Sequence, residues 1–205
     1  MLMYLEMRIK MIIGITGGIG TGKSTVLKIL NEKFGFSIFE ADKIAHELMS
    51  KGNAVYDRIV NEFGNDILKS DGEIDRKVMS SLVFNNKSRL ETINNIVHPA
   101  VIDEIKNRIE RENKLNGTDK FVVEAALLIE SGCSKICDKI WYIYSDDSIR
   151  IERLKSGRGM EEDAIKAVIK NQLNYEDFED KTDAMIDNSF SIDNTISQIE
   201  KLLEF

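Results

Sequence analysis

The chain alternates between short apolar runs and longer stretches in which apolar residues recur at helical spacing. Met11–Thr16 is a short run rich in β-branched residues, as expected of a buried parallel strand. A glycine-rich segment follows, and helical spacing then continues to about Gly35. A second apolar run at residues 36–39 precedes a helix that ends near Met49. The order strand, loop, helix, strand predicts the opening of a parallel α/β sheet.

The middle of the chain has a different pattern. From Asn53 to Asn116 the apolar residues recur at helical spacing, and no strong strand pattern interrupts them. Asp71-Gly72 marks a turn in this stretch. Pro99 is predicted to open a helix that continues through Ile109, because proline is tolerated in a first helical turn. The pattern predicts a helical insertion at one end of the sheet.

Strand patterns return after a polar linker at residues 114–120. The predicted strands are Phe121–Val123, Ile140–Tyr144 and Ala184–Ile186, and the predicted helices are one after Asp146, one over Glu161–Asp180 and one over Asp193–Leu203. Asp146 is a candidate N-cap for the first of these helices, because its side chain can accept a backbone hydrogen bond there. The second half of the chain therefore completes the sheet that the first half opens.

Composition narrows the functional classes. The 205 residues are 42% hydrophobic and 31% charged, which is typical of a globular domain with room for a subdomain. A net charge of −7 argues against general nucleic-acid binding. The apolar runs are far shorter than the roughly 20 residues that cross a bilayer, and residues 1–10 lack the order of a signal peptide. We expect a cytoplasmic protein without nucleic-acid or membrane partners, with residues 1–10 as an N-terminal extension.

The two cysteines, Cys133 and Cys137, are four residues apart, and the sequence holds no others. A zinc site or a disulfide is conceivable at this spacing. Two free thiols in a reducing cytosol are the favoured interpretation, because no further cysteine completes a thiolate site.

Residues 17–24 match the pattern G-x-x-x-x-G-K-[ST] between a predicted strand and a predicted helix, and we call them the P-loop. Glycines let successive N–H groups point at phosphate oxygens, and the following helix adds its N-terminal partial charge. Lys23 is predicted to bridge the β- and γ-phosphates, and Ser24 to bind Mg²⁺. The predicted nucleotide-binding residues are Gly18, Ile19, Gly20, Thr21, Gly22, Lys23, Ser24 and Thr25. An incidental glycine-rich turn rarely has this length and these flanks.

Other motifs distinguish the classes of P-loop protein. Asn86-Lys87-Ser88-Arg89 lacks the aspartate of the guanine-reading N-K-x-D motif. Recombination and transport ATPases usually end a later strand in an aspartate, and the nearest equivalent is Val122-Val123-Glu124. A small-molecule kinase is the remaining class of P-loop protein. The short chain, the helical insertion and the arginines in the last third of the chain favour it.

Five motifs in order resemble the dephospho-CoA kinase family. They are Thr16–Thr25, Glu40–Ala45, His98-Pro99, Leu127–Gly132 and Ile186–Ser189. The resemblance covers the chain from Met11 onward and implies ATP- and Mg²⁺-dependent phosphorylation of the ribose 3′-hydroxyl of dephospho-CoA, the last step of coenzyme A synthesis. It also implies an α/β P-loop three-layer sandwich with a mostly parallel sheet.

The resemblance divides the chain into three parts. Residues 11–43 and 120–205 are expected to form the nucleotide-binding core, with a lid at about residues 150–175. Residues 44–119 are expected to form the helical insertion that binds dephospho-CoA. The sequence does not indicate an oligomeric state, and we expect a monomer or a weak homo-oligomer.

Asp42 corresponds to the family's catalytic aspartate. A carboxylate just beyond the second strand can accept the proton of a ribose hydroxyl. The alternative is that Asp42 only caps the helix that follows. Arg153 and Arg158 are lid candidates that would stabilise the transferring phosphoryl group. The alternative is that both arginines only lie on a solvent-exposed helix face. The family typically has Arg-Asp four residues after the first lid arginine, whereas this chain has Gly157-Arg158.

The remaining candidates depend mainly on the resemblance. Arg76, His98 and Leu127 are expected to contact dephospho-CoA, and Asn188 the adenine of ATP. A surface ion pair for Arg76 and a packing or capping role for His98 are the plainer alternatives. Two departures are that Ala126 stands where the family usually has proline, and Phe190 where it usually has glycine.

Two other functions stay open from the residues alone. One is a nucleoside or nucleotide kinase, which would share the P-loop and place another acceptor beside Asp42. The other is a nucleotide-dependent switch whose helical insertion binds a protein partner.

Overall fold

One parallel five-stranded sheet organises the computed structural model, which describes residues 10–84, 86–172, 175 and 177–203. The strands are β1 (Met11–Thr16), β2 (Ser37–Glu40), β3 (Lys120–Glu124), β4 (Lys139–Tyr144) and β5 (Ala184–Asp187). Their order is β2-β3-β1-β4-β5, and every neighbouring pair is parallel. All five predicted strands are confirmed, with ends shifted by one residue at most. Of the predicted extension at residues 1–10, only Lys10 lies within the described residues.

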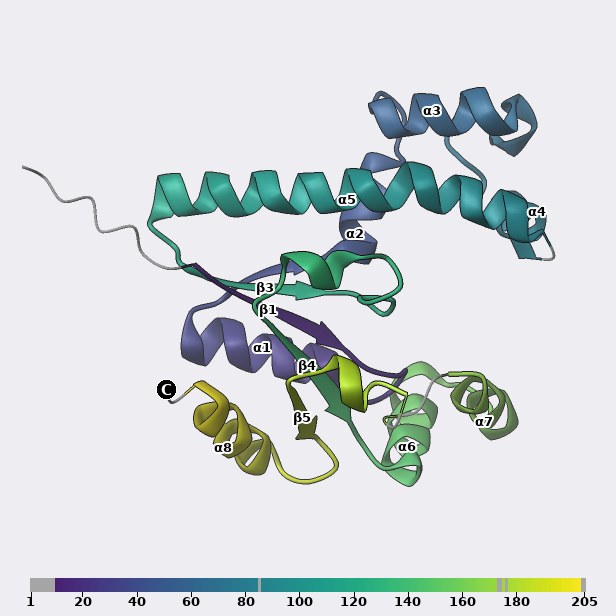
Figure 1. Ribbon diagram of the computed structural model, residues 1–205. Helices are drawn as coiled ribbons and strands as arrows, with labels where there is room; N and C mark the ends of the chain where they lie inside the picture. The colour runs from purple at the N-terminus through teal and green to yellow at the C-terminus, as the bar shows by residue number, and fades with distance from the viewer. Residues whose placement is uncertain (1–9, 85, 173–174, 176, 204–205) are drawn as a thin grey trace, which may run out of the picture.

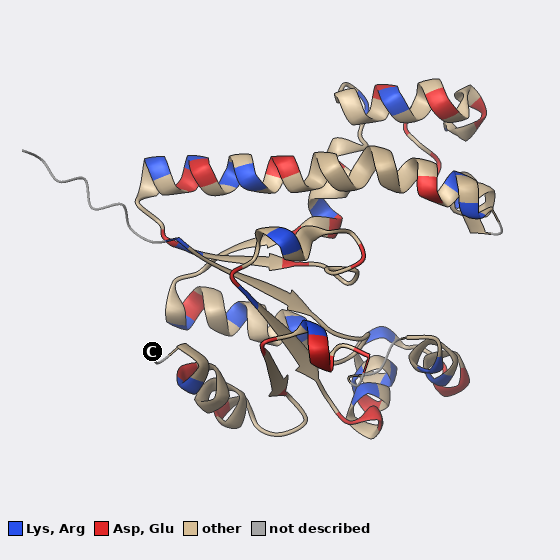
Figure 2. Ribbon diagram, viewed as in Figure 1, with Lys and Arg blue, Asp and Glu red and all other residues tan. Residues whose placement is uncertain are grey.

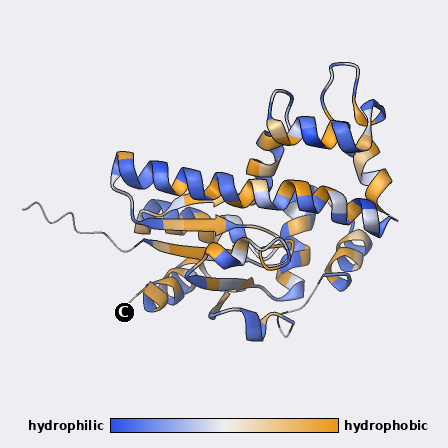
Figure 3. Ribbon diagram, turned by 45° about the horizontal axis from the view of Figure 1, so that its top comes forward, coloured by the Kyte–Doolittle hydropathy of each residue, from blue (hydrophilic) through white to orange (hydrophobic). Residues whose placement is uncertain are grey.

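The sheet is covered by helices on both faces (Figure 1). Because side chains alternate along a strand, Phe121 and Val123 of β3 enter one buried cluster and Val122 enters the other. α2 (Ala41–Leu48) and α5 (Lys87–Asn116) pack in the first cluster. α1 (Lys23–Phe34) and α8 (Ile192–Leu203) pack in the second. The predicted α/β three-layer sandwich is therefore confirmed, and Figure 3 shows the hydrophobic strands between helices with hydrophilic outer sides.

The middle of the chain is helical, as predicted. α3 (Ala54–Phe63), a 3-10 turn η1 (Asn65–Ile67) and α4 (Arg76–Phe84) pack on α5 and α2. The turn at Asp71-Gly72 is closed by an isolated antiparallel bridge between Leu68 and Ile74. Fully buried Ile59, Ile67 and Ile105 belong to the same cluster as β3. These helices therefore share one hydrophobic core with the sheet.

The prediction that Pro99 opens a helix is wrong. Pro99 lies inside α5, which begins at Lys87. An internal proline lacks the N–H for an i→i−4 hydrogen bond and costs about 3 kcal/mol. The helix continues through it because Val97, Val101 and Ile105 on either side are buried in the core. Tertiary packing thus outweighs the local preference of proline.

Two predictions about the last third of the chain need correction. After a 3-10 turn η2 (Cys133–Ile136) come α6 (Asp147–Arg158), α7 (Glu162–Lys170) and a 3-10 turn η3 (Glu179–Lys181). The helix predicted to run to Asp180 ends at Lys170, because Phe178 packs against Tyr142 with ring centroids 5.2 Å apart. Asp146 precedes α6, but its side chain accepts a hydrogen bond from the Tyr144 hydroxyl at 2.9 Å and does not cap the helix.

Acidic and basic residues are intermixed along the outer helices (Figure 2). On α5, Arg108 pairs with Glu104 at 2.7 Å and Lys114 with Glu110 at 3.9 Å, both one helical turn apart. The Lys114–Glu110 pair is exposed, and exposed pairs contribute little to stability. No helix among the described residues has the length and apolarity needed to cross a membrane.

Ile105→Ala tests the shared core. Ile105 is fully buried on α5, so we expect its truncation to lower the free energy of unfolding by about 2–5 kcal/mol. Urea denaturation followed by circular dichroism measures the change. Lys106→Ala, at the exposed neighbouring position, should change stability by no more than about 0.5 kcal/mol. Equal losses in both variants would contradict a core that α5 shares with the sheet.

Candidate active site

A cleft of about 870 Å³ lies at the carboxyl ends of the strands. The P-loop after β1, Glu40 at the end of β2, Glu124 at the end of β3 and Asn188 after β5 all line it. β1 leads to α1 on one face of the sheet, and its neighbour β3 leads to η2 on the other. Ligands of open parallel sheets bind in the crevice where neighbouring connections separate in this way.

Gly22 joins the P-loop to α1 and cannot carry a side chain. Its φ of 86° lies in the left-handed region, and a Cβ built there would be 2.1 Å from Asn188 Nδ2. The Gly22 carbonyl accepts the N–H groups of Thr25 and Val26 at 2.9 and 3.3 Å, which starts the helix. The loop therefore enters α1 directly, with the amides of the first helical turn at the cleft.

The Thr21 carbonyl is a fixed point of the P-loop. It accepts hydrogen bonds from Ser145 Oγ at 3.0 Å, Asn188 Nδ2 at 2.9 Å and Arg153 Nη1 at 3.4 Å. Arg153 also donates to Ser145 Oγ at 3.1 Å and to the Asn188 carbonyl at 2.8 Å. Asn188 Oδ1 in turn accepts from Thr195 Oγ1 at 2.9 Å. Two residues predicted to contact the nucleotide, Arg153 and Asn188, thus support the loop itself.

Lys23 is held at the centre of the site by two oxygen groups. Its ammonium donates to the Gly17 carbonyl at 2.8 Å and pairs with Glu124 at 3.8 Å. Burial lowers the pKa of Lys23, while the negative charges of Glu124 and Asp42 oppose that change. Burial likewise raises the pKa of Glu124 against the effect of Lys23. A phosphate would supply Lys23 with a further anionic partner in this partly desolvated position.

The structure brings Asp42 near Lys23. Asp42 is exposed in the first turn of α2, and its charge raises the pKa of both Lys23 and Glu124. Glu40, not Asp42, occupies the N-cap position of α2, so the capping alternative for Asp42 is wrong. Asp42 does not itself line the cleft.

The donor set is compatible with Mg²⁺. Ser24 is exposed at the start of α1 and lines the cleft together with Glu40 and Glu124. Nowhere in the described part of the chain do three or more histidine, cysteine or acidic side chains form a ready-made metal site. Mg²⁺ commonly keeps several waters and binds through one or two protein oxygens plus substrate phosphates. A hydroxyl with nearby carboxylates meets that requirement.

The other predicted residues divide into two groups. Arg158, at the end of α6, and Leu127, 59% exposed, both line the cleft. Arg76, exposed at the start of α4, and His98, half-buried within α5, are not among the residues that line it. Burial lowers the pKa of His98. The structure therefore gathers the phosphate-directed candidates and leaves two substrate candidates on the helical insertion.

Sequence reasoning missed several residues of the site. Glu124 ends a buried strand. This position indicates a site residue only when β3 is known to lie beside β1, which carries the P-loop at its end. Arg150 and Gln172 both contact the P-loop residue Ile19, although they lie 131 and 153 residues away along the chain. No local pattern predicts contacts at that separation.

Both cysteines are free thiols. Cys133 is buried, and the half-buried Cys137 lies with its Sγ 3.4 Å from the Cys133 carbonyl oxygen. Burial raises the pKa of Cys137 to about 12, so the reactive thiolate is disfavoured.

Comparison with known sequences gives one consistent result. The family model described as dephospho-CoA kinase matches residues 11–194. A dephospho-CoA kinase of Carboxydothermus hydrogenoformans is 39% identical over 193 residues, covering 94% of this chain and 93% of the relative. That of Fusobacterium nucleatum is 40% identical over 195 residues, covering 95% and 97%.

Solved structures share the fold. A crystal structure of a Thermus thermophilus protein superimposes with a TM-score of 0.79 at 22% identity, covering 95% of this chain and 97% of that one. A dephospho-CoA kinase from Campylobacter jejuni gives a TM-score of 0.58 at 28% identity, covering 95% and 96%. A shikimate kinase from Bacteroides thetaiotaomicron gives 0.56 at 14% identity, covering 95% and 99%.

Gly22→Ala tests the close approach at the P-loop. The added methyl group would collide with the Asn188 amide, so we expect ATP affinity to fall at least about tenfold, as for the loss of one charge-assisted hydrogen bond. Isothermal titration calorimetry measures the affinity. Gly35→Ala is the matched control, because Gly35 has a φ of 73° at the other end of α1 and nothing within 4 Å of a built Cβ. Gly35→Ala should lower the free energy of unfolding and leave ATP affinity unchanged. Equal losses of ATP affinity in both variants would contradict a specific collision at Gly22.

Proposed function

The chain belongs to the dephospho-CoA kinase family, and we propose that Lys23, Ser24 and Asp42 carry out the family's reaction in the cleft. In that reaction ATP phosphorylates the ribose 3′-hydroxyl of dephospho-CoA, which is the last step of coenzyme A biosynthesis. The observation that carries the assignment of roles is the strand order, which places Asp42 after β2, Glu124 at the end of the adjacent β3 and Lys23, 3.8 Å from Glu124, after β1.

Lys23 is proposed to stabilise the phosphoryl group in transfer. Its ammonium is held by the Gly17 carbonyl at 2.8 Å and is only partly paired with Glu124 at 3.8 Å. Negative charge spreads over the equatorial oxygens of a phosphoryl group during transfer, and a preorganised cation in a partly desolvated site stabilises it. The amides at the start of α1 are proposed to bind the remaining phosphate oxygens.

Asp42 is proposed as the general base. Its carboxylate accepts the proton of the ribose hydroxyl while the hydroxyl oxygen attacks the γ-phosphorus, and the bond from that phosphorus to the β,γ-bridging oxygen breaks to release ADP. Two features support this role. Asp42 is exposed, and it follows β2, so that it lies at the carboxyl ends of the strands, as the P-loop does. A base must lie within hydrogen-bond reach of the proton that it abstracts, and an exposed side chain in the first turn of α2 is accessible to a bound substrate.

Ser24 is proposed to hold Mg²⁺, with Glu124 or Glu40 as a nearby carboxylate. When held there, Mg²⁺ would offset the negative charge of the phosphates. Glu124 also offsets part of the positive charge of Lys23, with which it pairs at 3.8 Å.

The two lid arginines are proposed to act differently. Arg158 is exposed, lines the cleft and lowers the pKa of Lys23 by its charge, so we assign it to the transferring phosphoryl group. Arg153 is proposed to act mainly through the loop, because its guanidinium already binds Ser145 and the Thr21 and Asn188 carbonyls. The lid is proposed at about residues 150–175. Arg158 reaches the cleft even though it stands one position later than the family pattern expects.

Residues 44–119 are proposed to bind dephospho-CoA, and residues 11–43 and 120–205 to bind ATP. Dephospho-CoA is much longer than a ribose, so residues remote from Lys23 can contact its diphosphate or pantetheine part. Arg76 and His98, on α4 and α5, are assigned to that part, and Leu127 to the part within the cleft.

The adenine of ATP is proposed to lie beside Asn188 and Phe190. An amide NH₂ carries two donors, and the bond from Asn188 Nδ2 to Thr21 uses one of them. Phe190, 65% exposed, lines the cleft next to Ile192, 60% exposed, and such apolar side chains suit the face of a base. The protein is further proposed to act in the cytoplasm as a monomer or weak homo-oligomer, without nucleic-acid or membrane partners.

Acceptor preference tests the substrate. We expect rapid ADP release with ATP and dephospho-CoA, and little with adenosine, shikimate or gluconate, in a coupled assay. Turnover with another acceptor alone would remove the coenzyme A assignment, and ATP hydrolysis without any acceptor would favour a switch protein.

Asp42→Asn tests the base. The amide keeps the size of the side chain but cannot take the proton, so we expect kcat to fall about 10²- to 10⁴-fold. The Kd for ATP should change little, because Asp42 does not line the cleft. Asp57→Asn, at an exposed site on α3, is the matched control and should retain full turnover. Near-normal kcat in Asp42→Asn would exclude Asp42 as the base.

A further inference from the structure

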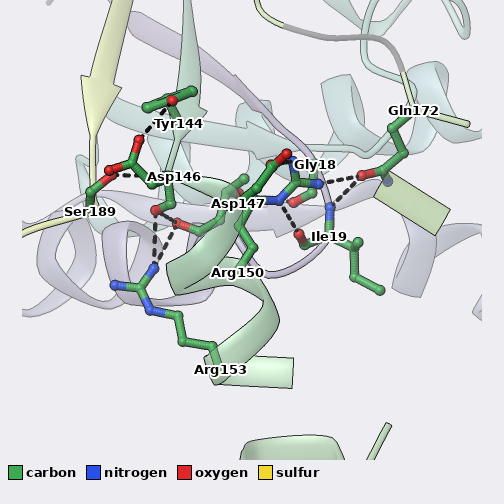
Figure 4. A network of polar contacts seen from close by, with 11 residues as sticks. Gly18, Ile19, Tyr144, Asp146, Asp147, Arg150, Arg153, Gln172 and Ser189 are labelled. Carbon is green, nitrogen blue, oxygen red and sulfur yellow. Dashed lines mark hydrogen bonds and ion pairs between the residues drawn. The ribbon is translucent and has the colours of Figure 1, made fainter. Parts of the chain in front are cut away.

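Both polar groups of the Ile19 main chain are bound by residues far away in the sequence (Figure 4). The Ile19 N–H donates to Gln172 Oε1 at 3.0 Å, and the Ile19 carbonyl accepts from Arg150 Nε at 2.9 Å. Arg150 Nη2 also donates to Gln172 Oε1 at 2.8 Å. The three residues therefore form a closed ring of hydrogen bonds that binds the two P-loop peptide units on either side of the Ile19 Cα. We call Arg150 and Gln172 the Ile19 brace.

A side chain on residue 18 would collide with the Ile19 brace. A Cβ built on Gly18 would lie 2.5 Å from Arg150 Nη2 and 2.8 Å from Gln172 Oε1. Arg150 is buried, and its Nη1 donates to Asp147 Oδ1 at 3.0 Å, so its charge has a partner. A buried guanidinium is costly unless it is paired and hydrogen-bonded. The Gln172 oxygen supplies one of those bonds as well as the acceptor for Ile19.

Gln172 connects a separate element to the P-loop. It follows α7, whose C-terminal turn is closed by the Asn171 N–H bonding to the Ala167 and Val168 carbonyls. Arg150 belongs to α6, as does Arg153, which supports Thr21. The two helices pack on each other, and the Lys155–Glu162 pair at 2.8 Å also joins them, outside the P-loop. Through Gln172 the position of α7 is linked to the peptide plane between Gly18 and Ile19.

We propose that Gln172 is a positioning residue for ATP. Its amide oxygen, together with Arg150, fixes the orientations of the two peptide planes that meet at Ile19 and thereby the shape of the P-loop in which Lys23 and Ser24 lie. This inference rests on the function proposed above. Loss of the oxygen removes an acceptor from the Ile19 N–H and from a buried guanidinium at once, so the loop loses preorganisation for the phosphates.

Gln172→Met is the decisive variant, because methionine keeps the length of the side chain without its oxygen acceptor. We expect the Kd for ATP, measured by isothermal titration calorimetry on the full chain, to rise about tenfold. The KM for dephospho-CoA should stay within about twofold of the unmodified protein, since Gln172 acts through the P-loop. Glu162→Gln is the matched control: it breaks the pair that joins the same two helices without touching Ile19, and ATP affinity should be retained.

A double-mutant cycle with Arg150→Met separates positioning from mere stability. Because the two side chains bind adjoining peptide units and also each other, the combined loss of ATP affinity should be clearly smaller than the product of the single losses. A change of less than twofold in the Kd of Gln172→Met overturns the proposal, whether or not its melting temperature falls. The binding readout needs no acceptor. Failure of the dephospho-CoA assay therefore refutes the proposed function, and an unchanged Kd refutes the role of Gln172.

Discussion

The site depends on the fixed backbone of the P-loop. An acidic protein can hold a polyanion only with local donors whose directions do not relax. Here the carbonyls of Ile19 and Thr21 are bound by side chains from α6, from the end of β4 and from the residue after β5. Binding of these two carbonyls fixes the Ile19–Gly20 and Thr21–Gly22 peptide planes and hence the directions of the Gly20 and Gly22 N–H groups. The glycines permit this conformation, and the side chains around the loop stabilise it.

The balance of charge around Lys23 follows from strand order. Because β3 lies beside β1, Glu124 reaches the buried ammonium, and β2 beside β3 brings Asp42 close to both. Burial disfavours the charged forms of Lys23 and Glu124, whereas their mutual attraction favours them. The site therefore holds both signs of charge at its centre before any nucleotide binds.

The helical insertion and the sheet share one hydrophobic core. Buried residues of α2, α3 and α5 share one cluster with β3, and α5 remains helical through Pro99 because of that packing. A substrate contact on α4 or α5 is thus connected to the cleft by packed side chains. On the other side of the cleft, α6 and α7 are connected to the P-loop by polar contacts at Ile19 and Thr21.

The sequence alone determined the five strands, the helical middle and the P-loop, because each depends on residues that are neighbours along the chain. It misjudged Pro99 and the extent of α7, where burial in the core and the packing of Phe178 on Tyr142 outweigh local preference. Only the tertiary structure placed Glu124 beside Lys23 and Gln172 on Ile19. Such contacts join residues more than a hundred positions apart, and they exist only after strand order and helix packing have brought those residues together.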